Sequence, residues 1–129
     1  MESVSALKVK FTDTNLMMAK LNKADLREAE FTNVDLTYVD LDGANLANAV
    51  FNNAKLVGAD FGESGLYGTI IKNSDLSGAI LTDTKGFEFE TLDGSCGDAH
   101  TKLPEGYTIP LCSNKEKMSN EIAELRASP

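Results

Sequence analysis

The chain has 129 residues, of which 42% are hydrophobic and 25% charged, and this composition is typical of one modest folded domain. Its formal net charge is -8 and its Lys and Arg residues form no cluster, which argues against direct binding to nucleic acid or to a membrane. The N-terminal residues lack a basic region followed by an apolar one, and no apolar run approaches the length of a membrane span. As sequenced, the chain is expected to be cytoplasmic.

Residues 1–8 form a short N-terminal lead, and residues 9–85 then repeat a five-residue pattern. A large apolar residue recurs at every fifth position, and a small residue, most often Ala, stands two places before it. The large position holds Phe11, Leu16, Leu21, Leu26, Phe31, Leu36, Leu41, Leu46, Phe51, Leu56, Phe61, Leu66, Ile71, Leu76 and Leu81. Such a long run in one register indicates a repeat architecture.

The period of five identifies the backbone conformation. A helix would advance about 500° over five residues and would form no apolar stripe. A flat strand alternates with a period of two, so an odd repeat would send successive large residues to opposite faces. Two consecutive outward residues in every five imply a corner instead, and four right-angle corners close a square coil of about twenty residues. Phe11, Phe31 and Phe51 recur at this longer spacing, as rings stacked on one inner face would. The sequence therefore predicts an all-β solenoid.

The second outward residue of each unit is expected to need a positive φ if the corner is a type II turn. Gly and Asn suit this position, and they occupy it at Gly43, Gly58, Gly68, Gly78, Asn33, Asn48, Asn53 and Asn73. Other residue types hold it near the N-terminal end, at Met18, Lys23, Glu28 and Tyr38. We therefore expect less regular corners in that part of the solenoid.

Several units match a known repeat. ADL at 24–26, VDL at 34–36, ANL at 44–46 and SDL at 74–76 resemble the A(D/N)LXX unit of the pentapeptide repeat family. The resemblance implies a right-handed quadrilateral β-helix of about four coils, about 19 Å long at the spacing of neighbouring strands. The tail over residues 92–112 looks like the closing segment of cyanobacterial and plant thylakoid-lumen members. The alternative location is therefore the thylakoid lumen, or a periplasm, if a targeting segment was removed.

Residues 86–129 form the predicted C-terminal cap, because the repeat pattern ends before them. A solenoid exposes its core at both ends, so apolar residues are needed to cover the last coil. The residues available for this are Phe87, Phe89 and Leu92. Further on, Ser113 and Glu116 form the pattern of a capping box and predict a short helix over about residues 114–126.

Cys96 and Cys112 are the only cysteines, and both fall in the predicted cap. A disulfide between them would close a loop of about 17 residues and contribute roughly 3 kcal/mol in the chain-entropy model. Two reduced thiols, as a cytosol would keep them, are the alternative. A redox-sensing pair is a variant of the bridged form.

No constellation of catalytic residues is found, so we expect neither an enzyme nor a bound cofactor. His100 is the single histidine and forms Cys-x-Asp-x-His with Cys96 and Asp98, but metal binding needs more ligands than this motif offers. Outer carboxylates such as Asp40 and Asp60 would stack one coil apart on a convex surface, which favours a solvated face over a catalytic cleft. We therefore predict no metal site.

Apolar side chains that would face outward form the candidate partner surface. They are Met17, Met18, Tyr38, Val50 and Ile70. The alternative is that the cap covers Val50 and Ile70 and that the others are scattered surface residues. The leading hypothesis is a monomeric, non-enzymatic module that presents flat acidic β faces to an unknown protein partner. The resemblance supplies another function, a DNA mimic that inhibits a type II topoisomerase, although four coils would match only a few base pairs.

Overall fold

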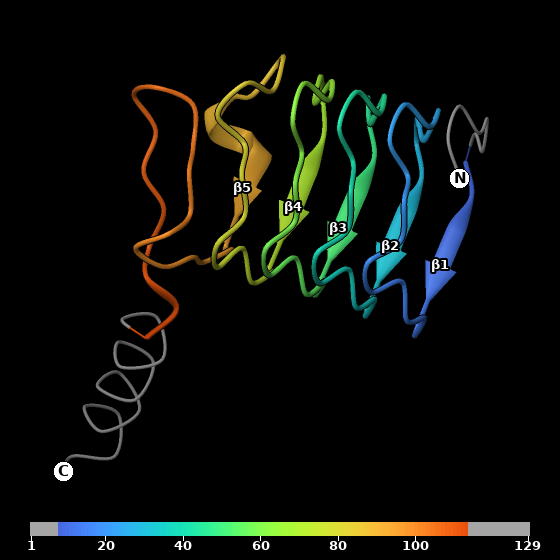
Figure 1. The fold of residues 1–129 in the computed structure, drawn as a ribbon, viewed down its shortest axis with the longest axis horizontal. Helices are drawn as coiled ribbons and strands as arrows, with labels where there is room; N and C mark the ends of the chain where they lie inside the picture. The colour runs from blue at the N-terminus through green and yellow to red at the C-terminus, as the bar shows by residue number, and fades with distance from the viewer. Residues whose placement is uncertain (1–7, 114–129) are drawn as a thin grey trace, which may run out of the picture.

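Five short parallel strands form one ladder along the molecule (Figure 1). The computed structural model describes residues 8–113, which wind into a right-handed quadrilateral β-helix. The strands are β1 (Lys10–Thr12), β2 (Glu30–Thr32), β3 (Val50–Asn52), β4 (Ile70–Lys72) and β5 (Leu92–Asp93), and their order in the sheet is β1-β2-β3-β4-β5. The all-β solenoid predicted from the period of five is therefore confirmed.

The strands occupy one of the four sides of the solenoid, which we call face 1. On each of the other three sides, isolated β-bridges join residues of successive coils. The paired positions are Asn15, Asp35, Lys55 and Asp75 on face 2, Lys20, Asp40, Asp60 and Ile80 on face 3, and Asp25, Asn45, Gly65 and Lys85 on face 4. Within each face the partners are one coil, or four repeat units, apart. Side chains at these positions point outward, so each face carries a column of stacked residues.

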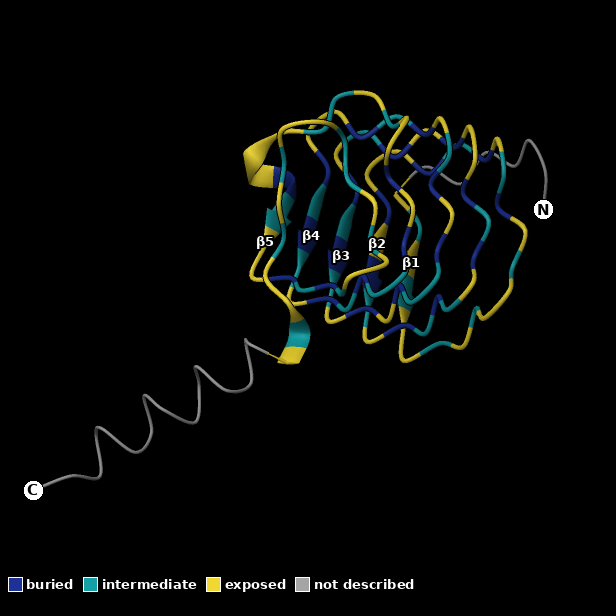
Figure 2. Ribbon diagram, turned by 60° about the vertical axis from the view of Figure 1, so that its left-hand side comes forward, coloured by how far each residue is buried: buried dark blue, intermediate teal, exposed yellow. Residues whose placement is uncertain are grey.

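The inward positions make one continuous apolar core (Figure 2). The rings of Phe31 and Phe51 are stacked with their centroids 4.6 Å apart, and Phe11 stacks on Phe31 at 5.2 Å. Ile71 continues this column in β4, whereas Phe61 meets Phe51 edge-on at 6.3 Å. The predicted stack of rings on one inner face is therefore confirmed.

The corners near the N-terminal end are regular, so the expectation of less regular corners there is wrong. Met18, Lys23, Glu28 and Tyr38 have φ values of 60°, 62°, 63° and 57°. The N–H group of Met18 donates to the carbonyl oxygen of Thr37 in the next coil at 2.8 Å, and similar bonds repeat up each corner. Together with the packed core, these bonds outweigh the roughly 1–2 kcal/mol that a left-handed residue costs.

An irregular corner lies instead between Phe61 and Ser64. There Gly62 takes the positive φ, 45°, in place of Glu63. A Cβ atom on Gly62 would clash with the side chain of Asp42, whose Oδ1 accepts the N–H of Glu63 at 2.9 Å. A carboxylate from the previous coil therefore enters this corner, and only glycine leaves room for it.

Gly58 and Gly78 occupy one corner column and have φ values of 66° and 70°. A Cβ atom on Gly58 would clash with the ring of Tyr38, whereas on Gly78 its nearest neighbour would be 3.7 Å away. We expect Gly58→Ala to lower the free energy of unfolding by about 1 kcal/mol more than Gly78→Ala, because the ring must leave its rotamer. Urea unfolding followed by circular dichroism measures the difference. In a Tyr38→Ala background the two substitutions should have equal effects, and a persisting difference would contradict the steric explanation.

A fifth, longer coil follows the repeats, and the last described residues, drawn in orange, lie beyond β5 (Figure 1). The partners that attach this coil are Leu92 with Ile71, Cys96 with Asp75, and Lys102 with Ile80. The first two pairs are 21 residues apart and the third is 22 apart, compared with 20 in the preceding coils. The ladder therefore continues past residue 85 although the repeat pattern is lost. In the described part of the chain, no helix has the length and apolar character of a membrane span.

The apolar residues of this coil divide between core and surface. Phe87 and Leu92 pack against the core as expected. Phe89 begins the 3-10 helix η1 (Phe89–Thr91) and is 81% exposed, so the expectation that it covers the core is wrong. Its ring turns instead toward Tyr107, with the two centroids 5.3 Å apart. The expected helix over 114–126 and the lead up to residue 7 lie outside the described residues.

Candidate functional surfaces

Where an Asp or Asn stands before the large residue of a unit, as at Asn45, it has a structural role that sequence reasoning missed. Its side-chain oxygen accepts the backbone N–H two residues further on, as when Ala47 N–H donates to Asn45 Oδ1 at 3.1 Å. Asp40 and Asp60 accept N–H groups in the same way, at 3.0 and 2.9 Å. These oxygens stabilise the turns, which explains why the unit favours Asp or Asn at this position.

Each outward column mixes positive and negative charge. Each of them contains a lysine: Lys55 lies between two aspartates on face 2, and Lys10, Lys20 and Lys85 lie at one end of faces 1, 3 and 4. On face 1, for example, Lys10 Nζ lies 3.6 Å from Glu30 Oε2 in the next coil. The acidic surplus of the chain is therefore dispersed over the described surface and does not form a continuous negative stripe.

The predicted partner surface separates into two places, of which the first is a corner. Met17, Met18 and Tyr38 lie between faces 2 and 3 in adjacent coils, with exposed fractions of 46%, 68% and 63%. We call these three residues the Met–Tyr corner. The ring of Tyr38 lies over Gly58 of the following coil, which extends the apolar strip along the axis.

Val50 and Ile70 lie on another side of the molecule. They are paired neighbours in β3 and β4 on face 1, and both are half-buried. Ile70 also lines a small hollow of about 40 Å³ together with Glu88 and Glu90 from the segment around η1. These two residues are therefore less accessible than the Met–Tyr corner and not continuous with it.

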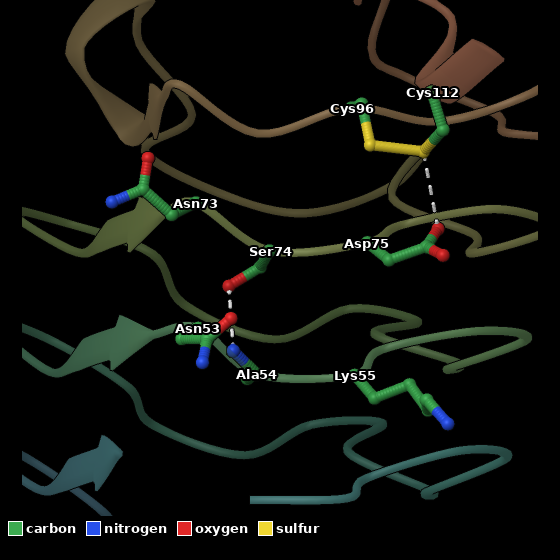
Figure 3. Close-up of a pocket in the computed structure, with 8 residues that line it drawn as sticks. All are labelled: Asn53, Ala54, Lys55, Asn73, Ser74, Asp75, Cys96 and Cys112. Atoms are coloured by element: carbon green, nitrogen blue, oxygen red, sulfur yellow. Dashed lines mark hydrogen bonds between the residues drawn. A yellow bond between two sulfur atoms is a disulfide. The ribbon is translucent and has the colours of Figure 1, made fainter. Parts of the chain in front are cut away.

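Cys96 and Cys112 form a disulfide, with their Cα atoms 4.8 Å apart (Figure 3). Cys96 belongs to the ladder, because its N–H donates to the carbonyl oxygen of Ser74 at 3.0 Å. Cys112 reaches it through a parallel bridge between Gly97 and Leu111. The disulfide ties the last described turn of the chain to the fifth coil, and it corresponds to one of the two thiol states that the sequence left open.

Asp75 lies beside the disulfide and was not expected there. Its Oδ1 is 3.4 Å from Sγ of Cys112 (Figure 3). The same oxygen accepts the N–H and the hydroxyl of Ser77 at 2.9 and 2.7 Å. A hollow of about 350 Å³ opens at this place, and Lys55 also lines it. Asp75 comes to Cys96 because the two residues are bridge partners one coil apart.

The Asp98 side chain stabilises a corner of the solenoid and does not form a metal-binding group with Cys96 and His100. Its Oδ1 accepts the N–H groups of Gly78 and His100, each at 2.9 Å. Burial raises the pKa of Asp98, but these bonds and the Thr101 hydroxyl outweigh it and hold the pKa below its ordinary value. Over residues 8–113, the one group of three or more side chains that could hold a metal ion is Asp75, Cys96 and Cys112, without Asp98 or His100.

The lowered pKa of Asp98 predicts a pH-dependent stability. A carboxylate with a depressed pKa stabilises the fold above its unfolded-state pKa, about 3.9 for Asp. That contribution is lost as the pH falls below this value and through the folded-state pKa. We expect Asp98→Asn to lower Tm by a few degrees at pH 7 and the gap to the parent to close in more acidic buffer. Thermal unfolding of both proteins across this range is the measurement, and a gap independent of pH would contradict the assignment.

A second hollow, of about 300 Å³, lies among aromatic side chains of the fifth coil and the segment after it. Phe87 and Tyr107 meet edge-on with their centroids 4.6 Å apart, and the Tyr107 hydroxyl donates to the carbonyl oxygen of Phe87 at 3.2 Å. These contacts hold the chain after β5 against the end of the core. They give this hollow a structural explanation.

Comparison with known proteins agrees with the repeat pattern. A family model described as pentapeptide repeats matches residues 10–46 and 44–83, more than half of the chain. No curated protein sequence matches. Among solved structures, the pentapeptide repeat protein Rfr23 from the cyanobacterium Cyanothece 51142 is 27% identical with a TM-score of 0.59, over 77% of this chain and 63% of that one. The chain thus spans less than two thirds of the length of this relative.

Two further structures are similar over most of the chain. A pentapeptide repeat protein from Nostoc PCC 7120 is 22% identical with a TM-score of 0.47, over 84% of this chain and 93% of that one. Another, from the Arabidopsis thaliana thylakoid lumen, is 16% identical with a TM-score of 0.37, over 93% of this chain and 74% of that one. Similarity at this level does not indicate a shared activity.

Proposed function

Because the chain belongs to the pentapeptide repeat family, we propose that it is a non-enzymatic module that binds a protein partner through the Met–Tyr corner. The observation that carries this proposal is the exposure of Met17, Met18 and Tyr38 at one corner of adjacent coils. Met and Tyr are favoured in protein interfaces, because the thioether adapts to a partner's shape and the phenol offers an apolar ring with a polar tip.

The backbone beneath this corner is held in place before any partner arrives. Met18 N–H bonds to Thr37 at 2.8 Å, and Tyr38 N–H bonds to Val57 at 2.8 Å. Binding would therefore order side chains only, which keeps the entropic cost of association small. Lys20 and Asp40 on the adjoining face 3 supply the polar rim that such interfaces have.

The DNA mimic that the sequence analysis raised as an alternative finds less support in this surface. Mimicry of a duplex calls for regularly spaced negative charge along a face, since the phosphates of DNA are regularly spaced. Here the columns lack that regularity, because Lys55 lies between Asp35 and Asp75 on face 2 and uncharged residues occupy much of faces 1 and 4. A gyrase supercoiling assay tests the alternative directly, and inhibition by the full chain would favour it over the proposed function.

Site-specific photo-crosslinking in the native cells tests the proposed function. A photoreactive aromatic residue replaces Tyr38 in the full chain, and in a matched control it replaces Tyr67, which is 60% exposed at another corner. We expect one partner to be captured from position 38 and not from position 67. With that partner purified, Tyr38→Glu should weaken binding about tenfold or more, and Tyr67→Glu should leave it unchanged. Equal capture at both positions, or equal effects of both substitutions, would refute the Met–Tyr corner as the interface.

A further inference from the structure

Beside the disulfide, three potential metal ligands converge on face 2. The side-chain ligand atoms of Asp75, Cys96 and Cys112 all lie within 4.8 Å of one another. We propose that, once a dithiol reductant has opened the disulfide, these three residues bind one thiophilic divalent cation of the Zn²⁺ class. Two thiolates and a carboxylate are ligands that Zn²⁺ takes, and three protein ligands with one open position is a known arrangement for it.

The ladder positions two of the ligands independently of the disulfide. Asp75 and Cys96 are bridge partners in consecutive coils. Cys96 N–H donates to Ser74 at 3.0 Å, and Cys96 accepts the N–H of Leu76 at 2.7 Å. The backbones at Asp75 and Cys96 therefore keep their separation when the sulfur–sulfur bond is broken.

Backbone hydrogen bonds also hold the third ligand. Cys112 N–H donates to the carbonyl oxygen of Gly97 at 2.9 Å, and Gly97 N–H donates to that of Pro110 at 2.9 Å. These two bonds join the segment around Cys112 to the residue that follows Cys96. The two cysteines thus remain neighbours after reduction, and rotation of their side chains can separate the sulfurs to about 3.8 Å, the spacing expected at a tetrahedral Zn²⁺ with bonds of about 2.3 Å.

The carboxylate of Asp75 is held in one orientation, and its surroundings have the space and the charge to accept a bound Zn²⁺ ion. Ser77 holds Asp75 Oδ1 through its N–H at 2.9 Å and its hydroxyl at 2.7 Å, an arrangement like the hydrogen-bonded partners that orient metal ligands. The hollow of about 350 Å³ leaves space for a water molecule at the open position. A Zn²⁺ ion with two thiolates and one carboxylate carries a net charge of -1, and Lys55 in the same hollow would offset it.

The chemistry has two balanced steps. In the first, a dithiol transfers two electrons and two protons to the disulfide, which gives two protein thiols and an oxidised, cyclic disulfide of the reductant. In the second, Zn²⁺ binds both sulfurs and the carboxylate, and the two thiol protons pass to solvent. The disulfide and the metal complex use the same sulfur atoms, so each excludes the other.

Direct metal titration of the full chain tests the proposal. The protein is reduced with a dithiol, freed of reductant without oxygen, and titrated with Zn²⁺ against a chromophoric chelator, and separately with Co²⁺ to detect thiolate-to-metal absorption. We expect one ion per reduced chain and none per oxidised chain. Cys96→Ser and Cys112→Ser should each abolish stoichiometric binding. Circular dichroism of the reduced protein must retain its β-sheet signal, and loss of that signal would overturn the proposal because the site would no longer exist.

Asp75→Asn and Asp35→Asn form a matched pair. Asp35 occupies the same face 2 column and is held by Thr37 much as Asp75 is held by Ser77. Asn15 and Asn45 accept turn N–H groups elsewhere in the fold, so either substitution should preserve its turn. We expect Asp75→Asn to weaken Zn²⁺ affinity about tenfold or more and Asp35→Asn to leave it unchanged. Equal affinities of the two variants, or binding that survives in the serine variants, would overturn the proposed ligand set.

Discussion

Replacing Phe31 with Ala is expected to lower the free energy of unfolding by about 3–5 kcal/mol. Its ring is fully buried, and it stacks on Phe11 at 5.2 Å and on Phe51 at 4.6 Å. The strands above and below are fixed by the ladder, so neighbouring side chains can fill little of the space that the ring leaves. Urea unfolding followed by circular dichroism measures the loss.

Two control variants distinguish packing from other causes. Phe31→Leu should lower stability less than Phe31→Ala, because Ile71 already occupies the same inner column as an aliphatic residue. Phe11→Ala should also have the smaller effect, since Phe11 lies in the first described coil and is only partly buried. If Phe11→Ala and Phe31→Ala lowered stability equally, the stacked column would not be the source of the effect.

Removal of the disulfide is the second change with a large expected effect. Cys96 and Cys112 are separated by 16 positions in the sequence, and closing a loop of this size contributes roughly 3 kcal/mol in the chain-entropy model. We expect the free energy of unfolding of the Cys96→Ser/Cys112→Ser double variant to be lower than that of the oxidised protein by about this amount. Both proteins are measured by urea unfolding in buffer that contains a chelator. Hydrogen exchange should locate the loss after Cys96, with protection of the strands β1 to β3 little changed.

The parent protein, reduced and metal-free, is the control for the serine substitutions themselves. It should match the double variant, because both lack the same crosslink. An oxidised parent no more stable than the double variant would mean that the backbone bonds of Gly97 and the aromatic contacts of Tyr107 alone hold this segment.

The core could be predicted from the sequence because its signal is periodic. Each inward residue, from Leu21 to Leu81, is specified by its place in a unit of five, and neighbouring units repeat the same information. The corner at Met18 was mispredicted for the opposite reason. Local preference disfavours a positive φ there, but hydrogen bonds from the next coil and the packed core decide the conformation.

The grouping of Asp75 with the cysteines could not be predicted, because it depends on where the register changes. The repeat pairs residues 20 apart, whereas Asp75 pairs with Cys96 at a spacing of 21. The repeat pattern ends at residue 85, but nothing in the sequence after it fixes how many extra residues the fifth coil takes up. The motif formed by Cys96, Asp98 and His100 was visible, but its three side chains do not come together, because Asp98 accepts the N–H of Gly78.

Because each repeat unit forms one side of a coil, the position of a residue in the sequence also determines the side of the solenoid on which it lies. Deleting one whole unit between Tyr38 and Asp75 would leave every inward residue pointing inward. All residues after the deletion would, however, be rotated by a quarter turn around the axis. The angle around the axis between the hollow beside Cys96 and the Met–Tyr corner would then change by a quarter turn. Deleting four units would remove one complete coil, which shortens the solenoid and leaves the later residues on their original sides. A change in the number of repeat units can therefore alter the angle between two surfaces while the pattern of inward residues is preserved.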